Sequence, residues 1–181
     1  VQRDSDSTIN SDCVGLVGIE MVCASFSRAR RAPRWSKMPH ALRGPGREVF
    51  GLPDLSPKEQ AHVDSGNKMY RHSIRTIRNR IRRNIPGYLE HPRSSWLWHT
   101  PGARRLLKSR KAFFRDFDMC PYGVAWQKPS RLLIWGKDPA EITLNKCHPC
   151  NGRCSTTGKR HIALTGLNKQ GFLARQAQVY P

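Results

Sequence analysis

The stretch Tyr88-Leu-Glu-His-Pro-Arg-Ser-Ser-Trp-Leu-Trp98 decides the fold that the sequence predicts. It opens with a short apolar approach, delivers one carboxylate at Glu90, and runs into a turn of Pro, Ser and Trp, which is typical of a strand end. An earlier apolar run, residues 13–22, has the composition of a strand covered on both faces and leads directly to Cys23. Because the carboxyl ends of neighbouring parallel strands open into one crevice, we expect Cys23 and Glu90 to face one ligand.

A helix is predicted between these two strands. Ser56-Pro57-Lys58-Glu59 combines an N-cap, a proline at the first helical position and a glutamate three residues after the cap. The helix is expected to end before Pro86. An apolar stripe at helical spacing faces one way and a row of arginines faces the other: the stripe is Tyr70, Ile74, Ile77 and Ile81, and the row is Arg71, Arg75, Arg78 and Arg82.

The later part of the chain continues the alternation of elements. A short basic helix is predicted over residues 101–110, and strands are predicted over residues 113–119, 131–135 and 161–165. Residues 28–57, rich in Pro, Gly and Arg, predict a long loop. Strands that alternate with helices predict a single α/β domain with a mostly parallel sheet.

The beginning of the chain and its cysteines bear on the compartment. Residues 1–12 are polar and predict a disordered lead, and because the chain starts at Val1 we expect a fragment or a processed piece. The opening residues lack the pattern of a secretory signal, and six cysteines in that context predict thiols or metal ligands. A reducing, intracellular compartment follows as the expectation.

The charge balance predicts a polyanionic partner. Thirty-two Lys and Arg residues against thirteen Asp and Glu residues give a formal net charge of +19. The basic residues gather in three runs, Arg28 to Arg47, Lys68 to Arg83 and Arg104 to Arg115. Nucleic acid is therefore the expected partner. The alternative is a basic surface that only confers solubility.

The surroundings of Cys23 favour its thiolate, which is the nucleophilic form of cysteine. Arginines follow it closely in the sequence, and the opposing interpretation is a small buried side chain in a loop. The candidate nucleic-acid contacts of this loop are Ser25, Ser27, Arg28, Arg30 and Arg31.

Three motifs, in order, resemble those of the DNA cytosine-5 methyltransferases. Cys23-Ala-Ser-Phe-Ser27 resembles the nucleophile loop Pro-Cys-Gln-Pro-Phe-Ser of that family. Glu90-His-Pro92 resembles its Glu-Asn-Val strand end, with His91 in place of Asn. Tyr122-Gly-Val124, followed by Arg131-Leu-Leu-Ile-Trp-Gly136, is similar to its Tyr-Gly-Val-Pro-Gln-x-Arg-x-Arg-Val-Phe-Ile-Ile-Gly segment.

This resemblance implies transfer of a methyl group from S-adenosylmethionine to C5 of cytosine in DNA. It also implies DNA as the nucleic-acid partner and a nuclear or DNA-associated location. In that chemistry Cys23 attacks C6 of a flipped-out cytosine, Glu90 contacts N3, and Arg131, with Lys128, steadies the intermediate. The donor-binding segment of the family has no counterpart before Cys23.

The resemblance therefore implies a partial Rossmann-like methyltransferase sheet. Residues 13–136 would form a methyltransferase-like catalytic half, and residues 137–181 a basic, loop-rich C-terminal extension. The alternative is a non-catalytic, basic nucleic-acid-binding module, for example from a mobile element, with a structural zinc loop.

The extension carries a candidate zinc site. Cys147, Cys150, Cys154 and His161 offer four soft or borderline ligands in one loop, a set that suits a tetrahedral zinc ion. His148 is a competing ligand, and free thiols in a turn are the alternative. Four protein ligands leave no open position for water, so the expected role is structural.

Overall fold

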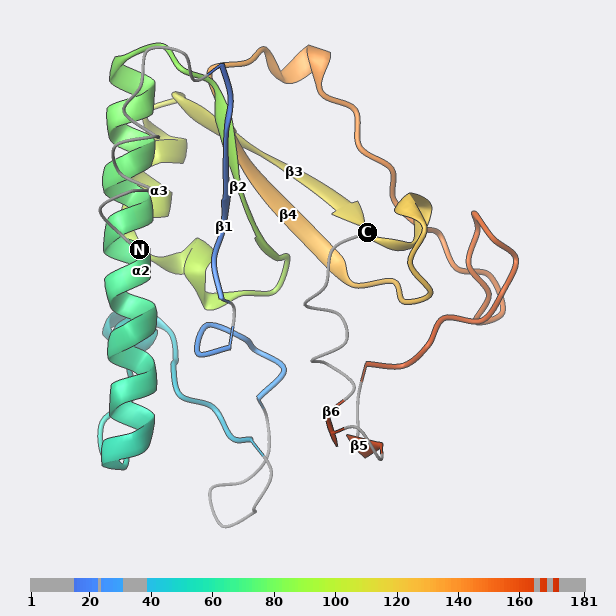
Figure 1. Ribbon diagram of the computed structural model, residues 1–181, viewed down its shortest axis with the longest axis horizontal. Coiled ribbons are helices and arrows are strands. Elements are labelled where there is room, and N and C mark those ends of the chain that lie inside the picture. The colour runs from blue at the N-terminus through green and yellow to red at the C-terminus, as the bar shows by residue number, and fades with distance from the viewer. Residues whose placement is uncertain (1–14, 23, 31–38, 165–166, 169–170, 173–181) are drawn as a thin grey trace.

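The computed structural model describes residues 15–22, 24–30, 39–164, 167–168 and 171–172 (Figure 1). It has a mixed α/β architecture in which two helices lie on one face of a four-stranded sheet. The sheet consists of β1 (Val17–Glu20), β2 (Gly87–Pro92), β3 (Ala112–Asp118) and β4 (Pro129–Trp135), and the helices are α2 (Pro57–Arg82) and α3 (Pro101–Lys108). Two short strands, β5 (Leu167–Asn168) and β6 (Gly171–Phe172), form a separate hairpin.

The strand order is β1-β2-β4-β3, and the sheet is mixed. β1 and β2 are parallel and joined through α2, whereas β4 runs antiparallel to both of its neighbours. The prediction of a mostly parallel sheet is therefore wrong. The link between β3 and β4 is too short for the crossover that parallel strands need, so the two strands pair as a hairpin and β4 enters the sheet reversed.

Helix α2 confirms the predicted helix and its limits. Ser56 and Glu59 form the capping box, with the Ser56 backbone N donating to Glu59 Oε2 at 3.0 Å, and the helix ends at Arg82. Tyr70, Ile74 and Ile77 of the stripe are buried. They join Leu89, Leu133 and Trp135 of the sheet in one core. No helix in the described part of the chain is long and apolar enough to cross a membrane.

The two outer strands of the sheet differ in how they are covered. Outside β3, Arg115 donates from Nε to the Ile142 carbonyl at 3.1 Å and stacks over Phe113 at 4.9 Å. Asp118 N donates to the Asn145 carbonyl at 3.1 Å, so the segment after β4 covers this edge. Among the described residues, β1 pairs only with β2.

A buried arginine joins the loop after β1 to α2. Arg43 is 2% exposed and lies before the 3-10 helix η1 (Gly46–Phe50). All five of its N–H groups are used: Nε donates to the Ser25 carbonyl, Nη1 to the Val49 carbonyl and Asn67 Oδ1, and Nη2 to Ser25 Oγ and the Val63 carbonyl. Its guanidinium also lies 3.6 Å from the centroid of the Phe26 ring.

Burial lowers the pKa of Arg43 to about 10, which leaves it charged at neutral pH. Its acceptors are carbonyl, amide and hydroxyl oxygens, so a network of dipoles holds the charge in the interior. Each of these acceptors that lost its donor would cost about 1–3 kcal/mol. Arg43 thus anchors the irregular region before α2 to the helix.

The strand predicted over residues 161–165 is absent from its described part. Residues 161–164 are irregular, and the His161 side chain lies with a group of cysteine thiols. Residue 165 lies outside the described residues.

Gly66 of α2 provides a test of the Arg43 anchor. A Cβ at this position would meet Ser25 Oγ, and it would lie 2.8 Å from Arg43 Nη2. Gly-to-Ala exchange inside a helix normally stabilises by about 1 kcal/mol. Here Gly66→Ala is expected to destabilise by about 1–3 kcal/mol, because it overpacks the anchor.

The measurement is the free energy of unfolding from urea denaturation, with Ser65→Ala as control because Ser65 is exposed on the same helix. Ser65→Ala should be neutral or slightly stabilising. A stabilising Gly66→Ala would show that Arg43 does not need this close approach.

Candidate metal centre

Four potential metal ligands meet beyond the end of β3. Cys120 belongs to the 3-10 helix η3 (Cys120–Tyr122), directly after β3, and the others are Cys147, Cys154 and His161. Figure 1 shows the segment after β4 running from one end of the sheet towards the end where β3 finishes. The three Sγ atoms and one imidazole nitrogen all lie within 4.8 Å of one another.

The separations match those of a tetrahedral zinc site. Cys147 Sγ lies 3.7 Å from Cys154 Sγ and 3.7 Å from His161 Nε2. Zinc–sulfur bonds of about 2.3 Å and zinc–nitrogen bonds of about 2.0 Å at the tetrahedral angle separate two sulfurs by about 3.8 Å, and sulfur from nitrogen by about 3.5 Å. The group therefore fits a Cys3His zinc site.

Hydrogen bonds around the group fix the position of Cys147. Its backbone N donates to Asp118 Oδ2 at 2.8 Å, which ties the loop to the end of β3. Ser155 Oγ lies 3.5 Å from Cys147 Sγ and accepts from the backbone N of His148 at 3.0 Å. Such supporting contacts orient metal ligands before the ion binds.

The thiols have divergent acidities. Burial, and then the adjacent thiols of Cys147 and Cys154, raise the pKa of Cys120 to about 12. The Thr157 side chain, by hydrogen bonding, lowers the pKa of Cys154 to about 5. Packed side by side, several thiolates repel one another, and a divalent cation removes that repulsion.

The predicted zinc set and the observed group share three members. Cys147, Cys154 and His161 lie together, as the sequence predicted. Cys150 is exposed and outside the group, and His148 is also exposed. Cys120 takes the fourth place; it was missed because it lies in a different segment, and only its position just after a predicted strand could have pointed to it.

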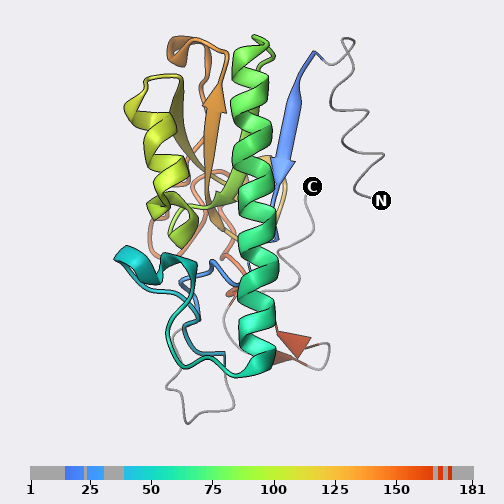
Figure 2. The same cartoon turned by 90° about the vertical axis from the view of Figure 1, so that its left-hand side faces the viewer.

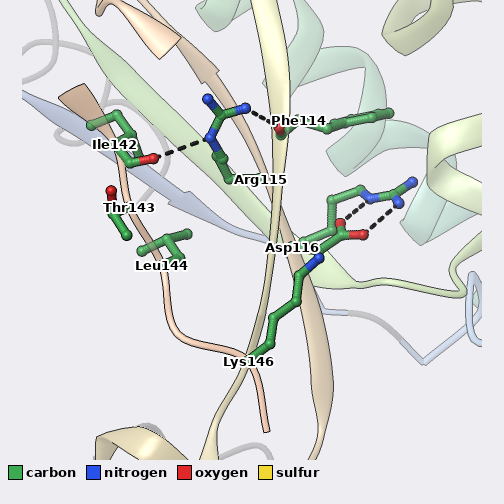
Figure 3. A pocket seen from close by; sticks show the side chains of 8 residues that line it. Phe114, Arg115, Asp116, Ile142, Thr143, Leu144 and Lys146 are labelled. Carbon is green, nitrogen blue, oxygen red and sulfur yellow. Dashed lines mark hydrogen bonds and ion pairs between the residues drawn. The ribbon is translucent and has the colours of Figure 1, made fainter. Parts of the chain in front are cut away.

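Arg131 lines a pocket of about 390 Å³ at the covered edge of the sheet. Figure 3 shows this pocket with Asp116 and Lys146 among its lining residues. Arg131 Nε and Nη2 donate to the two carboxylate oxygens of Asp116 at 2.5 and 2.9 Å, and the Arg131 guanidinium lies 4.5 Å from the Phe114 ring centroid. The hydrogen bond from Arg131 is the main reason that the pKa of Asp116 is lowered. Lys146, next to the candidate metal ligand Cys147, also lines this pocket.

Glu90 and Arg131 lie on opposite faces of the sheet. Residues paired across strands share a face, and Glu90 pairs with Leu132 whereas Arg131 pairs with His91. Glu90 is buried and lies beside Glu20 at the carboxyl end of β1. Cys23, the predicted nucleophile, lies outside the described residues.

The turns that follow β1 and β2 are in contact. Trp96 N donates to the Phe26 carbonyl at 3.0 Å, and Ser95 Oγ donates to the same oxygen at 3.3 Å. His91 is fully buried, and its ring is perpendicular to those of Phe26 and Trp98, with both ring centroids at 6.1 Å from its own. Burial, followed by the charges of Lys128 and Arg43, lowers the pKa of His91 to about 3, so this imidazole is neutral at physiological pH.

The nucleic-acid contacts predicted after Cys23 have different environments. Ser25 is buried, and its Oγ accepts a hydrogen bond from Arg43 Nη2. Ser27 Oγ accepts a hydrogen bond from the backbone N of Ala29. Arg30 is half-buried and donates to the His40 carbonyl at 2.9 Å. Arg28 is exposed, with its guanidinium 4.6 Å from the Trp96 ring centroid.

Two further predicted contacts complete this set. Lys128 is half-buried, in a left-handed backbone conformation with φ of 35°. Arg31 lies outside the described residues.

No protein family, curated protein or solved structure matches this chain. Its chemistry is therefore argued from its own residues.

The two alternative zinc ligand sets differ in a single cysteine, and this difference can be tested. Cys120→Ser should abolish stable zinc binding and lower the unfolding midpoint by at least about 5 °C, because each kcal/mol lost shifts the midpoint by about 2–4 °C in a chain of this size. The Cys150→Ser protein should retain zinc and unfold at the same temperature midpoint as the unaltered chain. The measurements are zinc content per chain after dialysis and thermal unfolding with and without a chelator.

Cys150→Ser is the matched control, since it removes one thiol from the same region. Loss of zinc from the Cys150 variant together with retention by the Cys120 variant would restore the set predicted from the sequence. Absence of zinc from the unaltered chain would exclude the centre.

Proposed function

We propose that this protein is a nucleic-acid-binding module whose C-terminal part is held in place by a structural zinc ion. The supporting observation is the arginine row of α2. Arg71, Arg75, Arg78 and Arg82 are all exposed or half-buried side chains of one helix, in a chain with a formal net charge of +19. A rigid row of guanidinium groups is suited to phosphates, which it can contact with paired hydrogen bonds.

The zinc centre supports this proposal through the loop that it organises. Three of its ligands, Cys147, Cys154 and His161, come from a segment with little regular structure. The exposed basic side chains of that segment are Lys146, Arg153, Lys159 and Arg160. Ordering a basic loop before binding reduces the conformational entropy lost when it meets a polyanion. Because all four ligand positions come from the protein, the ion has no open site for catalysis.

The salt dependence of binding tests the proposal. Binding of a labelled DNA duplex, followed by fluorescence anisotropy, should weaken steeply with salt, because every phosphate contact releases bound counterions. With four or more phosphates neutralised, the slope of log K against log salt should be steeper than about −3.5. The control is an uncharged, peptide-backbone analogue of the same bases, which should not bind. Binding that did not change with salt would refute this mode of recognition.

Methyl transfer to cytosine is a second candidate function, favoured by one observation. β1 and β2 are parallel and adjacent, with α2 as their crossover. In the sequence Cys23 comes three residues after the last residue of β1, and Glu90 lies within β2, two residues before its end. The hydrogen bonds from Ser95 and Trp96 to Phe26 hold the two following turns together. A nucleophile and an acid at one such crevice suit covalent attack on a flipped base. S-adenosylmethionine would be the methyl donor by resemblance.

Covalent trapping distinguishes this candidate from binding alone. DNA containing 5-fluorocytosine, incubated with S-adenosylmethionine, should form an adduct that survives denaturing electrophoresis, because the fluorine blocks release of the enzyme from C6. The adduct should be lost in Cys23→Ser and in Glu90→Gln, whereas Cys150→Ser should retain it. Failure of the unaltered chain to form an adduct would leave nucleic-acid binding as the function.

A further inference from the structure

A groove of about 770 Å³ lies between α2, α3 and η1, and arginines supply all of its charged lining residues. Figure 2 shows α2 and α3 side by side. None of the lining residues is acidic, so no internal ion pair crosses the groove. Four of the arginines come from α2 and one from α3: Arg71, Arg75, Arg78, Arg82 and Arg105.

The floor of the groove is apolar and fixed. Tyr70 and Ile74 are buried at its base, and the hydroxyl of Tyr70 accepts a hydrogen bond from the backbone N of Gly102 at 2.9 Å. This bond ties the first turn of α3 to the middle of α2. The groove is therefore formed before any ligand arrives, which reduces the entropic cost of binding.

An exposed aromatic ring also lines the groove. Phe50, at the end of η1, is 37% exposed, and its ring centroid lies 5.6 Å from that of Tyr70. An exposed phenylalanine beside a row of arginines is the combination by which proteins hold single strands: the ring stacks on a base and the cations contact the backbone.

We propose that this groove binds a single strand of nucleic acid, with its phosphates on the arginine row and one unpaired base on Phe50. The inference rests on the proposed function and names the substrate class and the place where it binds. The rise of 1.5 Å per helical residue separates Arg71 from Arg82 by about 16 Å along α2, which is room for several phosphates of one strand. The volume of about 770 Å³ lies in the upper part of the range of ligand sites, about 300–1,000 Å³, so the groove can hold a short run of nucleotides.

A duplex suits the groove less well. Its bases are stacked on one another and offer no free ring face to Phe50, whereas every unpaired base does. Arginine side chains can in addition stack on unpaired bases, which lysines do poorly.

The test compares a single-stranded oligonucleotide of about ten nucleotides with its duplex, using fluorescence anisotropy on the full chain at fixed salt. Phe50→Ala should weaken single-strand binding about 5- to 100-fold and leave duplex binding unchanged, since the stacking on one base is removed. Phe50→Trp should restore it. Running the DNA and RNA forms of one sequence in parallel shows which sugar is preferred.

Two charge variants test whether the single strand of nucleic acid binds along the arginine row. Arg75→Gln with Arg78→Gln should weaken single-strand binding at least about 10-fold and reduce the salt slope by about 0.7 for each phosphate that is no longer neutralised. Lys58→Gln with Lys68→Gln removes the same charge from exposed positions of α2 outside the groove, and should have a much smaller effect. Circular dichroism of each variant checks that the helix is intact.

The outcomes separate this inference from the proposed function. Equal losses of affinity in the two charge variants, or a Phe50→Ala protein that binds normally, would overturn the groove while nucleic-acid binding stood. Tighter binding of the duplex than of the single strand would also overturn it. Binding of neither form by the unaltered chain would remove the proposed function itself.

Discussion

The buried guanidinium of Arg43 is the interaction on which the N-terminal half of the protein depends. Arg43 connects the segment before α2 to the helix by donating to Ser25 and Val49 of that segment and to Val63 and Asn67 of α2. Because every donor is matched, the charge can be held in the interior at a modest cost, whereas a partly satisfied arginine would be strongly destabilising. The turn that follows β1 is thereby placed against α2, next to the strand end of β2.

The C-terminal part depends on a different kind of connection. Apart from the main core, its only buried cluster consists, among the described residues, of Cys120, Cys147 and Cys154. A cluster of three thiols buries too little apolar surface to order the long segment after β4. A bound metal ion would supply that order, and Asp118 connects it to the sheet through the backbone of Cys147. The two halves thus combine a network of hydrogen bonds with a candidate metal cross-link around one modest core.

The sequence predicts those features that depend on local chemistry. Helix α2, with its capping box and its buried Tyr70, Ile74 and Ile77, follows from periodicity and end signals alone. The mixed sheet was missed because strand direction depends on the length of a connection and not on strand composition. Cys120 was missed because the fold brings it to the other ligands from a separate segment. Arg43 gives no local signal either, since its five acceptors are distributed over distant parts of the chain.

The two edges of the sheet are covered unequally, and this determines at which edge a further strand could be added. The outer side of β3 is occupied by the segment that leads to Cys147, through Arg115 and Asp118. β1 pairs on one side only, within the described residues, and its backbone N–H and C=O groups on the other side form a template for another strand. A longer sheet, built from the same chain or from a second molecule, would therefore extend from β1 and leave the candidate metal centre and the arginine groove unchanged.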